Sequence, residues 1–263
     1  MKTPFILFVL GLSISPAVFG QTSSAGLRTP WEEISNEDGI RVFRREMEGS
    51  PFKGLKGIGV VDAPIAKVSA VLDDTTRRME WVANSRDCRT LKRINDYERI
   101  EYNHAAVPWP FQDRDFVFHA SVAVNPEAKE IRILMKSVED PLMPKRSGIV
   151  RGLIHQSNYL LREVDGGKRT LISVEVEADP AGEIPSWLVN TFQKGWARQM
   201  ISGIREQVAK PGITEMAMVR DALDGKIQAP RIHFADYDSK DAFLGFADQL
   251  IVSSSGIQRD VQQ

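Results

Sequence analysis

The spacing of apolar residues changes near residue 185, and this change limits the possible folds more than any other feature. Between residues 31 and 178, short stretches alternate with a period of two, which is typical of β-strands. A helical pattern interrupts them after Pro64. Beyond Pro185, apolar residues recur at every fourth position until Pro211-Gly212. Because parallel strands need long crossovers and the turns here are short, the pattern predicts an antiparallel sheet followed by one long helix, an α+β fold.

The predicted long helix carries a stripe of bulky apolar side chains. The stripe consists of Leu188, Phe192, Trp196, Met200 and Ile204. Such a stripe can pack into a solid core or form one wall of a cavity. Two glycines, Gly195 and Gly203, each weaken the helix by about 1 kcal/mol. Together with the deformable Met200, they favour the cavity wall.

Composition and motifs exclude several classes of protein. The 34 basic and 35 acidic residues give a net charge of −1, so the electrostatic footprint of a nucleic-acid binder is missing. Cys88 is the single cysteine, which excludes an intramolecular disulfide and zinc sites that need two cysteines, and we interpret it as a structural thiol. The sequence contains no phosphate-binding loop, no nucleophile elbow and no pair of histidines four residues apart. We therefore predict no catalytic residue, no cofactor and no metal.

The N-terminus has the features of a secretory signal peptide. Lys2 precedes a short apolar run and a small-residue exit near Gly20. The run is short for a membrane-spanning helix, although an uncleaved anchor is the alternative. The predicted organisation is a signal peptide over 1–20, a flexible lead-in over 21–30, a folded domain over 31–210 and an appendage over 211–263, partly helical or disordered. Export without a disulfide favours the bacterial periplasm.

Three segments, residues 74–81, 108–117 and 179–190, resemble the START family of steroidogenic-acute-regulatory-type lipid-transfer domains. The residues that carry the resemblance are Trp81, Asp113, Arg114, Asp115, Pro185 and Trp187. Their order and spacing agree with that family over about residues 31–210. The resemblance implies a helix-grip fold, in which a curved antiparallel sheet is closed by a C-terminal helix over a lipid-sized tunnel.

The resembling segments also have local structural interpretations. Asp113-Arg114-Asp115 could anchor a polar ligand group, but strand residues follow at once, so we favour a structural clamp. Pro185 suits the start of a helix, and we expect Trp187 to cap the closing helix against the sheet.

Polar residues that face the tunnel are the least determined part of the site. On the strand at 97–107, Arg99, Glu101 and Asn103 share one face, Tyr102 and His104 share the other, and only one face points inward. The candidates are Glu101, Tyr102, His104, Arg151 and Tyr159.

A proline-bracketed loop at 140–147 is a candidate gate. Leu142 and Met143 stand at its tip, next to the basic Lys145 and Arg146. The apolar pair could enter a bilayer while the basic pair meets anionic head groups. The alternative is a loop that packs against the end of the helix.

These features predict an exported, monomeric, non-enzymatic protein that binds a lipid and transfers it through transient membrane contact. The lipid could be a sterol, a hopanoid, a phospholipid or a fatty acid. One alternative is a cyclase or hydrolase on the same fold, which would need an ionisable pair in the tunnel, such as Glu101 with His104 or Tyr102 with Arg151. A second alternative is a protein-interaction module that uses the appendage.

Overall fold

The computed structural model describes residues 29–231, except for the side chains of residues 191–194. The strands are β1 (Glu32–Glu37), β2 (Ile40–Glu46), β3 (Lys53–Val61), β4 (Ser85–Arg93), β5 (Glu98–Ala105), β6 (Asp113–Asn125), β7 (Glu130–Ser137), β8 (Ile149–Arg151), β9 (Leu153–Val164) and β10 (Arg169–Asp179). The helices are α1 (Ile65–Asp73), the 3-10 helix η1 (Arg78–Glu80), α2 (Ser186–Val208) and α3 (Ala217–Leu223).

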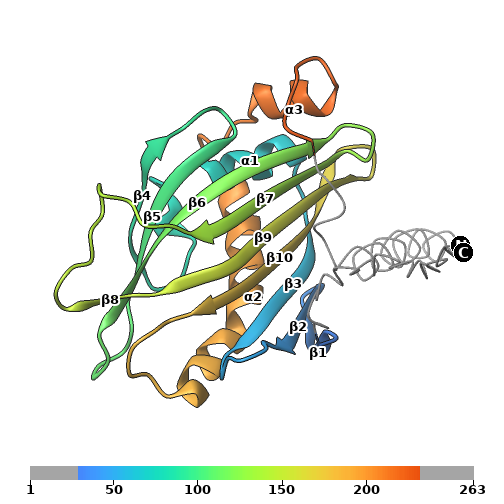
Figure 1. The fold of residues 1–263 in the computed structure, drawn as a ribbon. Coiled ribbons are helices and arrows are strands. Elements are labelled where there is room, and N and C mark those ends of the chain that lie inside the picture. The colour runs from blue at the N-terminus through green and yellow to red at the C-terminus, as the bar shows by residue number, and fades with distance from the viewer. Residues whose placement is uncertain (1–28, 232–263) are drawn as a thin grey trace, which may run out of the picture.

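The strands form one curved sheet (Figure 1). Their order is β1-β2-β3-β10-β9-β7-β6-β5-β4, and neighbours along this path are antiparallel. The short β8 pairs in parallel with the start of β6. The predicted α+β class and helix-grip architecture are confirmed.

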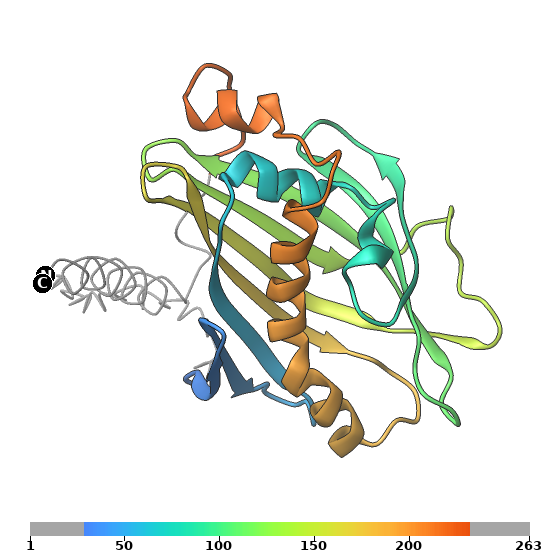
Figure 2. The same ribbon diagram turned by 180° about the vertical axis from the view of Figure 1, so that it is seen from behind.

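The long helix α2 crosses the concave face of the sheet (Figure 2). It approaches the sheet closely at Gly57, where a β-carbon would come within 2.8 Å of the Ala197 β-carbon. It also approaches the segment after η1, because a β-carbon on Gly203 would overlap the carbonyl oxygen of Trp81. The main apolar core fills the space between α2, α1 and this inner face of the sheet.

Beyond α2 the chain turns back and places α3 beside α1, at one end of the sheet (Figure 2). The Met216 amide donates a hydrogen bond to the Ala66 carbonyl (3.1 Å). The Lys129 ammonium bonds the Leu223 carbonyl at the C-terminal end of α3 (2.7 Å). Helix α3 therefore lies within the segment 211–263, which was expected to be partly helical or disordered.

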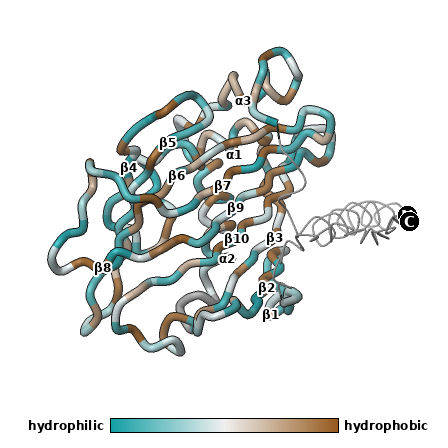
Figure 3. Tube along the Cα trace, in the orientation of Figure 1, coloured by the Kyte–Doolittle hydropathy of each residue, from teal (hydrophilic) through white to brown (hydrophobic). Residues whose placement is uncertain are grey.

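Apolar and polar residues alternate along the central strands, whereas the edge formed by β4 and β5 is mostly hydrophilic (Figure 3). Part of the outer face of this edge is covered by the loop between β7 and β8. Met143 of this loop packs against Tyr102 and Val117. The outer face of the sheet thus has a small apolar cluster of its own.

Some expectations lie outside the described residues. These are the signal peptide over 1–20, the lead-in up to residue 28, and the part of the appendage over 232–263. Among residues 29–231, no helix combines the length and apolar character needed to cross a bilayer.

Candidate functional site

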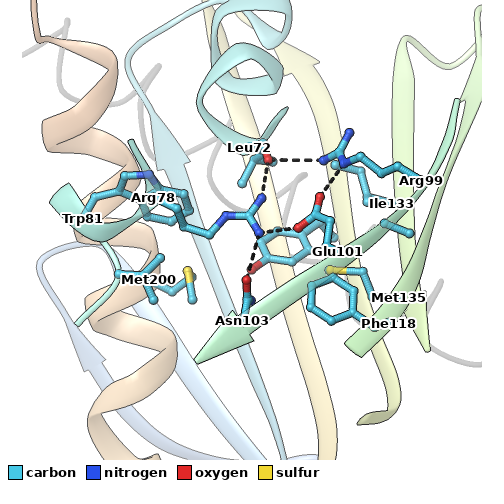
Figure 4. A pocket seen from close by; sticks show the side chains of 13 residues that line it. Leu72, Arg78, Trp81, Arg99, Glu101, Asn103, Phe118, Ile133, Met135 and Met200 are labelled. Atoms are coloured by element: carbon cyan, nitrogen blue, oxygen red, sulfur yellow. Dashed lines mark hydrogen bonds and ion pairs between the residues drawn. The ribbon is translucent and has the colours of Figure 1, made fainter. Parts of the chain in front are cut away.

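A cavity, which we call the main cavity, lies between α2, the α1–η1 segment and the inner face of the sheet (Figure 4). With its mouth it encloses about 500 Å3, of which about 80 Å3 is open to the centres of water-sized molecules. Its lining residues are Leu72, Arg78, Trp81, Val82, Arg99, Glu101, Asn103, Phe118, Ala120, Ile133, Met135, Tyr159 and Met200. The wall is therefore apolar on most sides and charged at one end.

Buried charges form the polar end of the main cavity. Glu101 has 1% of its side chain exposed and pairs with both Arg78 and Arg99. Arg99 also pairs with Asp73 at the end of α1. Arg78 bonds the Leu72 carbonyl (2.9 Å) and the Asn103 side-chain oxygen (3.4 Å). Two arginines and two carboxylates thus form a network at the cavity wall, and the exposed Arg93 also pairs with Asp73 (3.4 Å).

The turn between α1 and η1 explains why Arg78 points inward. The Asp74 carboxylate accepts hydrogen bonds from the Thr76 amide (3.0 Å) and the Arg77 amide (3.3 Å), which closes a tight turn. This turn leads into η1 and directs Arg78 towards the sheet, as Figure 4 shows. Arg77 instead bonds Glu80 on the outside.

Electrostatics keeps the network ionised. Burial alone would raise the pKa of Glu101, but the charges of Arg78 and Arg99 and their hydrogen bonds outweigh it and hold this pKa below the ordinary value. Burial lowers the pKa of Arg78, but Glu101 more than compensates and the net shift is upward. Two guanidinium partners hold the buried carboxylate in one geometry. A ligand in the cavity therefore meets charged groups with fixed positions.

Two further groups of the wall are suited to an oxygen atom of a ligand. The Trp81 ring nitrogen is buried and has no hydrogen-bond partner within residues 29–231. Burial raises the pKa of Tyr159 to about 12, so its hydroxyl stays protonated at neutral pH. An unpaired buried donor costs about 1–3 kcal/mol, which an acceptor on a ligand would recover.

The predicted helix stripe meets the cavity at one described residue. Met200 lines the main cavity, Ile204 is fully buried in the core, and Trp196 packs against that core. Leu188 is half-buried near the start of α2. The Phe192 side chain lies outside the described residues. The stripe therefore serves partly as core and partly as cavity wall.

The polar candidates divide between the two faces of the sheet. Glu101 and Tyr159 line the main cavity. Tyr102, His104 and Arg151 do not, and the expectation that they face the tunnel is corrected here. Since side chains alternate along a strand, the neighbours of Glu101 and Asn103 project from the opposite face.

The three outer-face residues have structural partners instead. Arg151 bonds Asp115 (2.7 Å), and Tyr102 is covered by Met143 and bonded by Arg146. His104 bonds Asp113 (2.9 Å). Neither ionisable pair that the enzyme alternative requires, Glu101 with His104 or Tyr102 with Arg151, comes together in the cavity.

The predicted gate loop packs on the outer face of the sheet. Leu142 is 61% exposed, but Met143 is only 8% exposed because it fills the space beside Tyr102 and Val117. The expected tip of two apolar side chains is therefore reduced to Leu142. The Arg151 guanidinium, which bonds the Met143 carbonyl (3.2 Å), also fastens the loop to the sheet.

The residues of the second resembling segment tie the start of β6 to its surroundings. Arg114 donates to the carbonyls of Pro180 (3.2 Å) and Ala181 (3.0 Å), rather than forming a fork between the flanking carboxylates. Asp113 accepts from the Val107 amide (3.0 Å). These contacts join the β5–β6 turn to the turn that precedes α2.

The other motif residues occupy three different environments. Pro185 is the N-cap of α2. Trp187 is 67% exposed, so it does not close the helix against the sheet as expected. Trp81 lines the main cavity. Cys88 is buried near Ser85, and burial raises the pKa of its thiol, which disfavours a thiolate nucleophile.

Sequence reasoning assigned no role to Arg78 or Asp73, although both form part of the network. Arg78 stands in the first resembling segment, and the signal that could have revealed it is the charged face of β5. Three polar residues, Arg99, Glu101 and Asn103, can be buried together only if another charge meets them.

The fold and the main cavity define a helix-grip protein that encloses space for a small apolar molecule. A family model described as the START domain matches residues 27–212. The phosphatidylcholine transfer protein of Mus musculus is 24% identical over 167 residues, which cover 62% of this chain and 77% of that protein.

Two solved structures agree with this match. The STAR-related lipid transfer protein from Xanthomonas axonopodis has a TM-score of 0.61 at 26% identity and covers 68% of this chain and 99% of that one. Human STARD10, at 21% identity, supports the fold alone, with a TM-score of 0.64 over 78% of this chain and 85% of that one. The chain belongs to the START domain family.

Proposed function

We propose that this protein binds a lipid in the main cavity and transfers it between membranes. The observation that carries the proposal is an apolar cavity under α2 with Arg78, Asn103 and the unpaired Trp81 ring nitrogen at its wall. Transfer of apolar surface from water into such a cavity contributes roughly 25 cal/mol per Å2. Trp81 and Arg78 supply donors for an oxygen atom of the lipid.

The volume of the main cavity bears on how a lipid enters it. Binding sites for small molecules usually have a volume of roughly 300–1,000 Å3. The main cavity reaches this volume only when the space at its open mouth is counted. We therefore propose that the wall moves apart on binding. Relatives are named for lipid transfer, and the ligand classes that we propose for this chain are sterols, hopanoids, phospholipids and fatty acids.

Met200→Trp is expected to block binding, because the larger ring would fill the narrow space beneath α2. We expect the affinity for a fluorescent fatty acid to fall by more than about tenfold, which corresponds to ~1.4 kcal/mol. The measurement is a fluorescence titration of the delipidated protein, together with native mass spectrometry of lipids that remain bound after purification.

The neighbouring exposed residue Gln199 provides the control. Gln199→Trp adds the same ring on the outside of the helix and should leave affinity unchanged. Equal affinities of wild type and Met200→Trp would contradict the proposed location of the ligand.

We also propose a membrane-contact surface at the end of the sheet where β6, β9 and α2 begin (Figure 1). Large apolar side chains are exposed there. They are Trp109 (91% exposed), Leu142, Leu153 and Trp187. Leu142 is the part of the predicted gate loop that remains available for this contact.

Trp109→Ala combined with Trp187→Ala is expected to slow lipid exchange between vesicles by about tenfold. Burial of one such side chain in a membrane stabilises the bound state by roughly 1.5–3 kcal/mol, and neither ring lines the main cavity. Affinity for lipid in detergent should therefore stay unchanged. Ile227→Ala removes an exposed apolar side chain beyond α3 and is the matched control. Parallel losses of exchange rate and affinity would refute the assignment.

We propose further that the protein acts as a monomer in a bacterial periplasm, after cleavage near Gly20. The support is the signal-like pattern of residues 1–20. The intact mass of protein isolated from the producing cell would test it, since a chain that still begins at Met1 in the cytoplasm contradicts export.

A further inference from the structure

A second, smaller cavity lies under α3, and we call it the α3 chamber. It is enclosed by α3, α1, the β4–β5 turn and the inner face of β5, β6 and β7. About 40 Å3 is open to the centres of water-sized molecules. Most of its wall is apolar, with Val122 and Ile131 on the sheet side and Met216 and Val219 on the side of α3. The family match ends at residue 212, so α3 is an addition to the matched region.

The α3 chamber and the main cavity share part of their walls. Arg99 and Ile133 line both. Arg99 is held on this boundary by its ion pairs with Glu101 and Asp73. These two side chains therefore form the boundary between the two cavities, and a chain that reaches from one to the other has to pass them.

A buried serine stands in the wall of the α3 chamber. Ser69 lines it, with only 7% of the residue exposed. Its Oγ has no hydrogen-bond partner among the described residues. A buried hydroxyl left unpaired costs about 1–3 kcal/mol, so helix α1 retains an unfavourable group at this position unless something in the chamber bonds it.

We propose that the α3 chamber is the distal end of the lipid tunnel, and that it takes the end of a single acyl chain carrying an oxygen function. This inference rests on the proposed function of the main cavity. The proximal oxygen of the lipid lies near Arg78 and Trp81, the chain passes Ile133, and the distal oxygen bonds the Ser69 hydroxyl. Helix α3 forms the wall that closes this end, so it limits the length of the chain.

The first test compares ω-hydroxypalmitate with palmitate as probes. A net hydrogen bond is worth about 0.5–1.5 kcal/mol, so the wild type should bind the hydroxylated acid about two- to tenfold more tightly. Ser69→Ala should remove this preference. Its melting temperature should not fall, because the change deletes an unpaired polar group. A preference that persists in Ser69→Ala would overturn the assignment of Ser69.

The second test fills the α3 chamber. Val219→Phe should lower the affinity for palmitate by at least about tenfold, or ~1.4 kcal/mol. The affinity for octanoate should stay unchanged, because the shorter chain ends before the chamber. Ala217→Phe adds the same ring at an exposed position of α3 and should change neither affinity.

The outcomes separate the two proposals. If palmitate binds and Met200→Trp blocks it, but Val219→Phe and Ser69→Ala change nothing, the α3 chamber is refuted and the main cavity stands. If the wild type binds neither palmitate nor octanoate, the proposed function fails for acyl lipids and the α3 chamber fails with it.

Discussion

Replacement of Glu101 by glutamine is expected to lower the free energy of unfolding at neutral pH by about 3–5 kcal/mol. This is the usual cost of removing one partner from a buried ion pair, because the remaining charges stay buried without compensation. Here Arg78 loses its carboxylate partner, whereas Arg99 keeps its ion pair with Asp73. Chemical denaturation of both proteins measures the difference. Glu32→Gln, which breaks the exposed pair with Arg44, should cost much less, because water screens exposed charges.

The cost of Glu101→Gln should also depend on pH. The folded pKa of Glu101 lies below the ordinary value of 4.5. A depressed carboxyl pKa contributes stability that is complete above pH 4.5 and is lost as the pH falls towards the folded pKa. The stability difference between wild type and Glu101→Gln should therefore be constant near neutral pH and shrink below pH 4.5. A difference that is the same across this range would show that folding does not lower the pKa of Glu101.

The two glycines of α2 are expected to respond to alanine with opposite signs. A β-carbon on Gly203 would overlap the Trp81 carbonyl, so Gly203→Ala should destabilise the fold by about 1–3 kcal/mol. A β-carbon on Gly195 would meet only the Gln199 side chain, at 3.3 Å. Since alanine favours a helix over glycine by about 1 kcal/mol, Gly195→Ala should stabilise it. Thermal denaturation of the pair gives the result, and a stabilised Gly203→Ala would mean that α2 does not approach Trp81 closely.

The sequence was sufficient for the fold because its strongest signals are local. Alternation along β5–β10 predicts antiparallel strands, and the four-residue spacing after Pro185 predicts α2. The glycines of this helix were interpreted as room for a ligand or for a close backbone approach, and Gly203 provides the second, against the Trp81 backbone, whereas Gly195 does not.

The site was harder to predict, because it depends on contacts between distant segments. Along β5, the residues Ile100 and Tyr102 are less polar than Arg99 and Glu101, so alternation alone points the wrong face inward. Two contacts between distant segments determine which face of β5 points inward. Arg78 reaches Glu101 from the η1 turn, and the loop that carries Met143 covers Tyr102 on the outer face of the sheet. Neither contact leaves a trace in local spacing. The same loop was expected at the tunnel mouth because of its apolar tip. An apolar tip alone, however, does not show which surface the loop covers.

The part of α2 from Ala197 onwards is attached to the rest of the fold at several points. Ala197 lies on Gly57, Arg198 pairs with Glu37 and Asp38, and Gln207 bonds Glu80. The end that carries the exposed Trp187 lies at the proposed membrane surface.

We expect this part of α2 to stay in place when a ligand enters the main cavity, because many contacts would have to break at once to move it. Glu80, which bonds Gln207 and Lys210 near the C-terminal end of α2, belongs to the same helical turn as Arg78. A change at this end of α2 would therefore reach Arg78 through Glu80, and with it the polar end of the main cavity.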